Sequence, residues 1–198
     1  MQNWIPHPTS LTSEIVELVP LEKIHFPELI ELSKEKRIWE QYVFDGSNST
    51  RLSTVLESAL EERENGNQYP FVILLKRKNK LIGCTRFLEI QPQHKKLEIG
   101  STWLHPDYWG TSANAECKLL LLTFCFEILH ALRVQLKTDE NNIRSRKAIE
   151  KIGGRFEGII RNDMVRDNGT KRNSAIYSIL DEEWSDRKHE LIKLVQKK

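Results

Sequence analysis

Cysteine is scarce in this chain, with three residues among 198. They are Cys84, Cys117 and Cys125, an odd number that includes no Cys-x-x-Cys pair. This pattern argues against a disulfide framework and favours reduced thiols in the core of a cytosolic protein. A catalytic cysteine needs a histidine partner and an exposed, electropositive setting. The apolar sequence around Cys117 and Cys125 suggests neither.

An excess of one charge is also missing, because 30 basic side chains are balanced by 28 acidic ones. A net charge of +2 gives no electrostatic reason to expect nucleic acid or an anionic membrane as a partner. The most apolar run, Leu119–Leu132, is too short to span a bilayer and contains Thr123, Glu127 and His130. Their helical spacing predicts a mostly buried core helix. The first ten residues lack the pattern of a secretory signal, so we expect a cytoplasmic protein.

Nucleotide and metal motifs are absent as well. The sequence has neither Gly-x-x-x-x-Gly-Lys-Ser/Thr nor Gly-x-Gly-x-x-Gly, which excludes the common nucleoside triphosphatase and dinucleotide-binding signatures. Its six histidines show no His-x-x-x-His spacing, and we predict no metal. No repeat and no Pro/Gly/Ser linker divides the chain, so a single domain over residues 1–198 is expected.

Hydrophobic periodicity predicts an α+β protein whose first strands are antiparallel. An Asp167-Asn168-Gly169 turn predicts a hairpin near the carboxyl end. The expected strands are 13–20, 71–77, 81–90, 96–104, 133–138, 156–165 and 172–180. The expected helices are 25–42, 51–66, 114–131, 141–154 and one that starts near Glu182.

A run of six small residues, from Gly110 to Ala115, separates a strand from the apolar helix. The first turn of a helix has unpaired backbone N–H groups and a partial positive charge. Small side chains there let an anion approach the amides, so the run suggests a phosphate cradle. A tight connection packed under a neighbouring element would explain the same residues.

Two segments at matching spacing resemble the GNAT superfamily of acetyl-CoA-dependent N-acetyltransferases, in particular its RimJ/RimL-like branch, which acetylates ribosomal-protein N-termini. They are EIGSTWLHPDYWGTSANAECKLLLLTFCFEIL (98–129) and RVQLKTDENNIRSRKAIEKIGGRFEG (133–158). The ending IYSILDEEW (176–184) is also similar. The resemblance implies an α+β GNAT fold, with a central, mostly antiparallel mixed sheet of about seven strands flanked by helices. It also implies acetyl transfer from acetyl-CoA to a primary amine, foremost a protein N-terminal α-amine.

The resemblance also implies where coenzyme A binds. The family cradles the pyrophosphate at the helix start, which here is Trp109, Gly110, Thr111, Ser112, Ala113, Asn114 and Ala115. Backbone contacts to the pantetheine arm and the acetyl oxygen are placed at Thr102, Trp103, Leu104 and His105, with a bulge near Gly100. Asn142 either caps its helix or contacts the coenzyme.

Ser112 departs from the family, which usually has glycine at this position. A positive φ at this position would strain a serine. If only its backbone N–H matters, the serine is harmless, and we favour this second case.

For catalysis the resemblance implies Glu98 as general base, or alternatively as a structural carboxylate paired with Arg86 or Lys96. Many relatives have a tyrosine acid where Ile149 stands, and isoleucine cannot donate a proton. Ser145, one helical turn away, is then the candidate acid, unless its hydroxyl only packs at the helix start.

The acceptor site is implied by the aromatic residues Trp39 and Tyr42, which core packing would explain equally well. Asn173 stands where the branch often has aspartate, which weakens inference about the acceptor from relatives. A small amine, a polyamine or an antibiotic is the alternative to a peptide. A non-catalytic module that binds or senses acetyl-CoA is the alternative to an enzyme. A homodimer is compatible with the family, but no residue pattern decides it.

Overall fold

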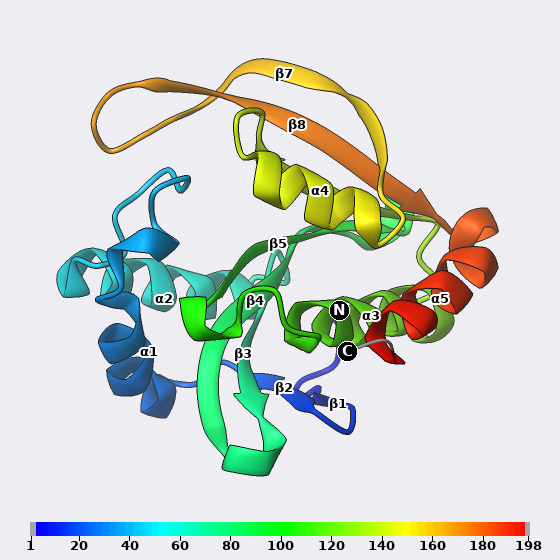
Figure 1. Ribbon diagram of the computed structural model, residues 1–198, viewed down its shortest axis with the longest axis horizontal. Helices are drawn as coiled ribbons and strands as arrows, with labels where there is room; N and C mark the ends of the chain where they lie inside the picture. Colours follow the sequence, from blue (N-terminus) through cyan, green and yellow to red (C-terminus); the bar gives the residue numbers. More distant parts are fainter. Residues whose placement is uncertain (1–2, 197–198) are drawn as a thin grey trace.

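The computed structural model describes residues 3–196, the larger part of the predicted domain 1–198, and its centre is a mixed sheet of eight strands (Figure 1). The strands follow the spatial order β1-β2-β3-β4-β5-β6-β8-β7. They are β1 (Leu11–Thr12), β2 (Val16–Pro20), β3 (Tyr69–Leu75), β4 (Lys80–Gln91), β5 (Lys96–Leu104), β6 (Arg133–Asp139), β7 (Arg155–Val165) and β8 (Lys171–Leu180). The α-helices are α1 (Phe26–Ser33), α2 (Ser49–Glu64), α3 (Ala113–Thr123), α4 (Ile143–Lys151) and α5 (Asp181–Gln196).

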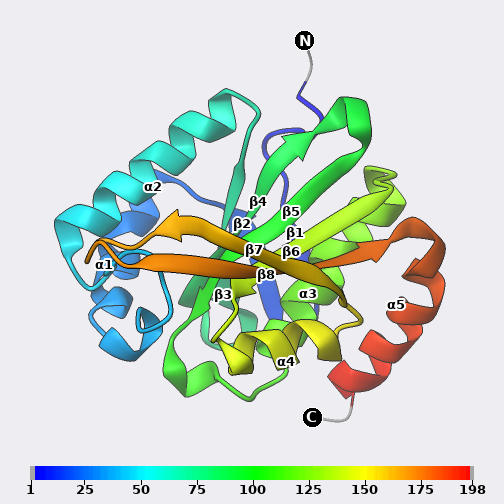
Figure 2. The same ribbon diagram turned by 90° about the horizontal axis from the view of Figure 1, so that it is seen from above.

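Helices cover both faces of the sheet (Figure 2). On β3, Phe71 and Ile73 belong to the main core with α3 and α5, whereas Val72 packs in a second cluster under α1 and α2. Successive side chains of a strand point to opposite faces, so this central strand is buried on both sides. The continuous apolar run PFVILL therefore forms a strand rather than a helix.

The predicted α+β fold and its element order are confirmed, with several differences in detail. The sheet has eight strands rather than about seven, because Leu11–Thr12 forms a short strand of its own beside β2. The strand expected from residue 13 begins at Val16, since the Ser13 hydroxyl is used in a turn that bonds to the backbone of Val16. The third difference concerns the helix expected at 25–42.

The prediction of one helix over residues 25–42 was wrong. Helix α1 ends at Ser33, and Glu35 takes an extended backbone conformation while its side chain accepts a hydrogen bond from the Arg37 N–H. The chain then turns so that the indole of Trp39 donates to the Ser33 carbonyl at 2.7 Å. Burial of this large ring under α1 and α2 outweighs continuation of the helix.

The apolar stretch after residue 113 is helical as predicted, but it ends earlier than expected. Helix α3 passes into a π-helical turn, Phe124–Ile128, and His130 has a left-handed φ of 51°. Glu127, on the polar stripe, accepts hydrogen bonds from Trp184 and Lys188 of α5. Within residues 3–196, no helix has the length and apolar character that crossing a membrane requires.

The sheet forks between β5 and β6, and this fork positions the site. These parallel strands pair only from Lys96 to Glu98 on β5 and from Arg133 to Gln135 on β6. On its other side, β5 carries a bulge opposite β4, where Ser101 has a left-handed φ of 46°. A bulge bends and twists its strand, so β5 diverges from β6 beyond Glu98.

Candidate active site

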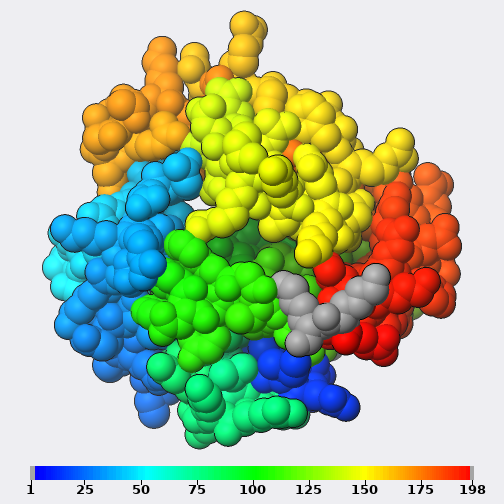
Figure 3. Space-filling model, viewed as in Figure 1, coloured from blue at the N-terminus to red at the C-terminus, as the bar shows by residue number. Residues whose placement is uncertain are grey.

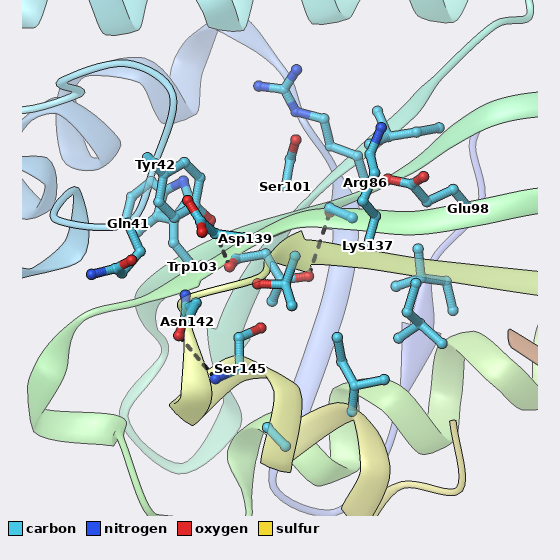
Figure 4. Close-up of a pocket in the computed structure, with 18 of the residues that line it drawn as sticks. Gln41, Tyr42, Arg86, Glu98, Ser101, Trp103, Lys137, Asp139, Asn142 and Ser145 are labelled. Atoms are coloured by element: carbon cyan, nitrogen blue, oxygen red, sulfur yellow. Dashed lines mark hydrogen bonds between the residues drawn. The ribbon is translucent and has the colours of Figure 1, made fainter. Parts of the chain in front are cut away.

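A cavity of about 850 Å³ occupies the fork. Its walls come from β4, β5 and β6, from α4, and from the segments before α2 and α3. Figure 3 shows the surface hollowed between α4 and the segment before α3, and Figure 4 shows the side chains that line the interior. Parts of β5 and β6, the start of α4 and the loop before α2 therefore surround the same cavity.

Glu98 lies at the base of the fork, at the last residue where β5 pairs with β6. It is 4% exposed, and its Oε2 accepts a hydrogen bond of 2.8 Å from Gln135 Nε2 on β6. Burial raises the pKa of this carboxyl above its usual range, partly offset by the Gln135 hydrogen bond. In the described residues Glu98 makes no ion pair with Arg86 or Lys96, the partners that a structural role would have used. The carboxyl group therefore lines the cavity without a charged partner among the described residues.

Thr102 is the centre of a polar network at the bulge. Its hydroxyl is 2.7 Å from that of Thr85 and accepts a hydrogen bond of 2.8 Å from Lys118 Nζ on α3. The Thr102 carbonyl accepts a hydrogen bond of 2.7 Å from the Tyr42 hydroxyl. Side chains from both faces of the sheet thus hold the bulge in place. The bulge lies directly after Gly100, where the sequence predicted it.

The backbone of β5 beyond the bulge has two different edges. The His105 N–H donates to the Ile82 carbonyl of β4 at 2.9 Å, so this amide is not available to a coenzyme. Trp103, two residues earlier, shares that edge and pairs with Cys84. Thr102 and Leu104 present the opposite edge, where their carbonyls accept from Tyr42 and from the Trp109 indole. Of the four predicted backbone contacts, the geometry favours Thr102 and Leu104.

The small-residue segment forms the turn into α3. Gly110 has φ 74°, a left-handed conformation that favours glycine, whereas Ser112 has φ −68° and precedes the first helical residue, Ala113. Ser112 is therefore unstrained, as the harmless case requires. Trp109, Gly110 and Asn114 line the cavity, while Thr111, Ser112, Ala113 and Ala115 complete the turn and the helix start beside it.

Helix α4 closes the cavity from the far side. Asn142 caps the helix, because its Oδ1 accepts a hydrogen bond of 3.0 Å from the Ser145 N–H. The face predicted to point inward does so, since Asn142, Ser145, Ala148, Ile149 and Ile152 all line the cavity. Figure 4 shows Asn142 and Ser145 together at the start of this helix.

The two aromatic residues predicted for the acceptor site have different positions. Tyr42 lines the cavity and bonds to the bulge. Trp39 is 5% exposed, packs against Trp103 with ring centroids 5.4 Å apart, and does not line the cavity. The prediction that Trp39 contacts the acceptor was wrong, because the ring belongs to the core under α1 and α2.

The family model of the acetyltransferase (GNAT) domain matches residues 16–155, which hold the fork, the bulge, the turn into α3 and α4. The chain belongs to the GNAT family. The family and the N-acetyltransferase class predicted from the sequence are thereby confirmed.

Individual relatives and solved structures are similar to this GNAT chain over differing shares of its length. "Putative ribosomal N-acetyltransferase YdaF" of Bacillus subtilis (strain 168) is 26% identical over 86% of this chain and 92% of YdaF. YoaA of the same organism is 28% identical, but the match spans 51% of this chain and 56% of YoaA. A GCN5-related N-acetyltransferase from Brucella melitensis has a TM-score of 0.87 at 26% identity, over 96% of this chain and 86% of that one.

A structure of Mycobacterium smegmatis RimJ in complex with CoA-disulfide shares the fold. Its TM-score is 0.81 at 19% identity, over 98% of this chain and 97% of the RimJ chain. This likeness supports the fold alone.

The sequence did not predict that two buried cations of this GNAT chain line the cavity. Lys118 on α3 is 6% exposed, and burial lowers its pKa from 10.5 to about 8. Arg86 on β4 is 7% exposed, and both side chains line the cavity. The signal for Lys118 was its charge within an otherwise apolar helix. Arg86 gave a weaker signal, a single charge within the mostly apolar run Leu81–Leu88.

Arg144 and Arg146 also have defined places on α4. The guanidinium of Arg144 stacks on Trp109, with 3.7 Å between Cζ and the ring centroid, so it covers the turn into α3. Arg146 donates to the Tyr177 hydroxyl at 2.8 Å and holds α4 against the sheet. Among residues 3–196, no three His, Cys, Asp or Glu side chains gather into a metal site, and the absence of a metal stays a prediction.

Substitution of Ser112 by glycine is expected to change acetyl-CoA affinity by less than about tenfold. The φ of Ser112 lies in the ordinary helical region, so glycine relieves no strain and removes only a hydroxyl. Calorimetric titration of the wild type and the Ser112→Gly variant with acetyl-CoA measures the difference. A much larger gain for the variant would show that serine distorts the cradle.

Proposed function

We propose that this chain transfers the acetyl group of acetyl-CoA to a primary amine, and that a protein N-terminal α-amine is its acceptor. The observation that carries the proposal is the buried carboxylate of Glu98 at the base of a fork whose edge holds the turn into α3. The fork offers room for a thioester arm, and the turn offers a helix N-terminus to phosphates. The family supplies the chemistry of acetyl-CoA as cosubstrate.

In the proposed reaction the nitrogen lone pair of a neutral amine attacks the thioester carbonyl carbon. The new C–N bond forms as the C–S bond breaks, and the coenzyme leaves as a thiolate that takes up a proton. Glu98 removes the amine proton, directly or through water, because its raised pKa makes it a better base than an ordinary carboxylate. The Thr102 and Leu104 edge of β5 positions the thioester arm.

Ser145 is proposed to relay a proton from solvent water to the leaving thiolate, so that its hydroxyl gives up one proton and takes up another. It lines the cavity, and its position one turn from Ile149 puts a hydroxyl where the isoleucine can supply none. The Asn142 cap accepts a hydrogen bond from the Ser145 backbone N–H and so holds the first turn of α4. The sequence prediction of Ser145 as acid is retained as part of this proposal.

The proposed protein N-terminal acceptor is supported by the similarity to YdaF, whose name describes a putative ribosomal N-acetyltransferase. A protein α-amine titrates near neutral pH, so a single carboxylate of raised pKa is sufficient to complete its deprotonation. Small amines, cytoplasmic location and a homodimer remain open predictions for this chain.

Incubation of the purified protein with acetyl-CoA and a panel of peptides and small amines tests the proposal. Mass spectrometry of the products and coupled detection of free CoA thiol should show acetylated peptide α-amines formed together with CoA. Binding of acetyl-CoA without transfer to any acceptor would favour the sensor alternative instead. Transfer to small amines only would contradict the proposal that the acceptor is a protein N-terminal α-amine.

A further inference from the structure

Arg86 is a buried cation on the side of the cavity opposite α4. It lies on β4, directly across from Gly100 of β5, and lines the cavity while only 7% of its surface is exposed. Figure 4 shows its side chain leaving the strand and extending past Ser101. No step of the acetyl transfer described above uses this residue.

The hydrogen bonds of Arg86 are few and long. Its Nη1 donates to Gln68 Oε1 at 3.3 Å and its Nη2 donates to the Val55 carbonyl at 3.5 Å, both neutral acceptors. Its Nε is buried without a partner in the described part of the chain. Burial also lowers the pKa of this guanidinium. The described residues therefore supply no negative charge to balance it.

Two other arginines of this chain with little exposed side chain have carboxylate partners. Arg63, also buried, is 3.0 Å from Glu22 Oε1, and Arg172 is 3.8 Å from Asp139 Oδ2. Burial of a guanidinium without a counter-ion is unfavourable, and a hydrogen-bonded anion offsets this cost. Arg86 differs from these two residues because it lines the cavity and forms no ion pair with a carboxylate of the described residues.

Glu98 lies on the same face of the sheet as Arg86. Gly100, the strand partner of Arg86, has no side chain, and a Cβ built on it would lie 2.8 Å from Glu98 Oε1. The carboxylate thus lies over the position that faces Arg86, while the guanidinium extends away toward α2. A molecule with its amine at Glu98 can place a second group, several bonds away, at Arg86.

We propose that Arg86 binds a carboxylate of the acceptor, so that the substrate class is a primary amine that also carries an acidic group. This inference rests on the proposed acetyl transfer and on Glu98 as the position of the amine. Two sources share this chemistry: an acidic side chain next to the N-terminus of a peptide, and a free acidic amino acid. Guanidinium and carboxylate match in geometry, which makes arginine suited to this recognition.

The test compares acceptors of equal size that differ in one charge. Peptides that begin Ala-Asp and Ala-Asn, and free aspartate and asparagine, are assayed for kcat/KM with the wild type and with the Arg86→Gln and Arg86→Lys variants. We expect at least a tenfold preference for the acidic member of a pair, mainly through KM. The preference should vanish in Arg86→Gln and persist in part in Arg86→Lys. The pair that shows it, peptide or amino acid, identifies the source.

Arg77→Gln is the matched control, because it removes one exposed positive charge outside the cavity. Thermal melting confirms that each variant is folded. Equal kcat/KM for acidic and neutral acceptors in the wild type, or a preference that survives in Arg86→Gln, would overturn the inference and leave acetyl transfer intact.

A binding measurement keeps the test independent of turnover. The N-acetylated Ala-Asp and Ala-Asn peptides are titrated calorimetrically into the wild type and Arg86→Gln. Tighter binding of the acidic product, lost in the variant, supports the anion site even if no acceptor is acetylated. Equal binding of both products contradicts it.

Discussion

Substitution of Glu98 by glutamine is expected to lower kcat more than tenfold and to leave acetyl-CoA affinity within about threefold. The amide keeps the size of the side chain and can still bond to Gln135, but it cannot accept the amine proton. Steady-state kinetics with a peptide acceptor and calorimetric titration with acetyl-CoA measure the two effects. Glu57→Gln, an exposed change on α2, is the control.

The pH profile separates this role from a structural one. Protonation of the acceptor amine lowers kcat/KM on the acidic side in both proteins. Because burial raises the pKa of Glu98, the wild type should show a second loss of kcat/KM at a pH above 4.5, and this second loss should be absent in Glu98→Gln. The raised pKa also means that folding stability is lost as pH rises from 4.5 through the folded-state value. The variant avoids this loss and should be at least as stable as the wild type at pH 7. Unchanged turnover in Glu98→Gln would remove Glu98 as the base.

Substitution of Lys118 by methionine is expected to raise the free energy of unfolding by about 2 kcal/mol at pH 7. The fall in its pKa from 10.5 to about 8 corresponds to about 3 kcal/mol against the charged form in the folded state. The methionine variant avoids this penalty but loses the hydrogen bond from Lys118 to Thr102, which costs it about 1 kcal/mol of stability. Urea unfolding of both proteins gives the difference.

The size of this stability difference depends on pH in a defined window. The pKa of Lys118 is lower in the folded chain, so the wild type bears the full penalty below pH 8 and recovers stability as pH rises toward 10.5. The advantage of the methionine variant should therefore shrink across this window. Lys147→Met, at an exposed position of α4, controls for the loss of one charge. A variant less stable than the wild type at pH 7 would contradict the account.

Local signals in the sequence predicted much of the site. The small-residue run and the pattern Asn142, Ser145, Ile149 depend on neighbours a few positions away. Gly110 and Asn114 of the run line the cavity, as do all three residues of the pattern. Gly110, rather than Ser112, takes the positive φ, a detail that composition could not assign because both residues occur in the same turn.

Long-range packing accounts for what the sequence did not predict. Trp39 became core because its indole bonds back to Ser33, which required the helix over 25–42 to break. The roles of Arg86 and Lys118 depend on which partners the fold brings to them across the bulge. A charged residue in an apolar segment either extends its charged group to solvent or keeps that group buried. Only the positions of the other strands distinguish these two cases.

Titration of the purified wild type with acetyl-CoA in a calorimeter, beside free CoA, tests the central claim that the fork is an acetyl-CoA site. Micromolar binding at one site per chain is the predicted result, and Ser112→Gly should bind within about tenfold of it. Absence of binding at millimolar acetyl-CoA would contradict the claim, and the roles proposed for Glu98 and Ser145 would be withdrawn with it.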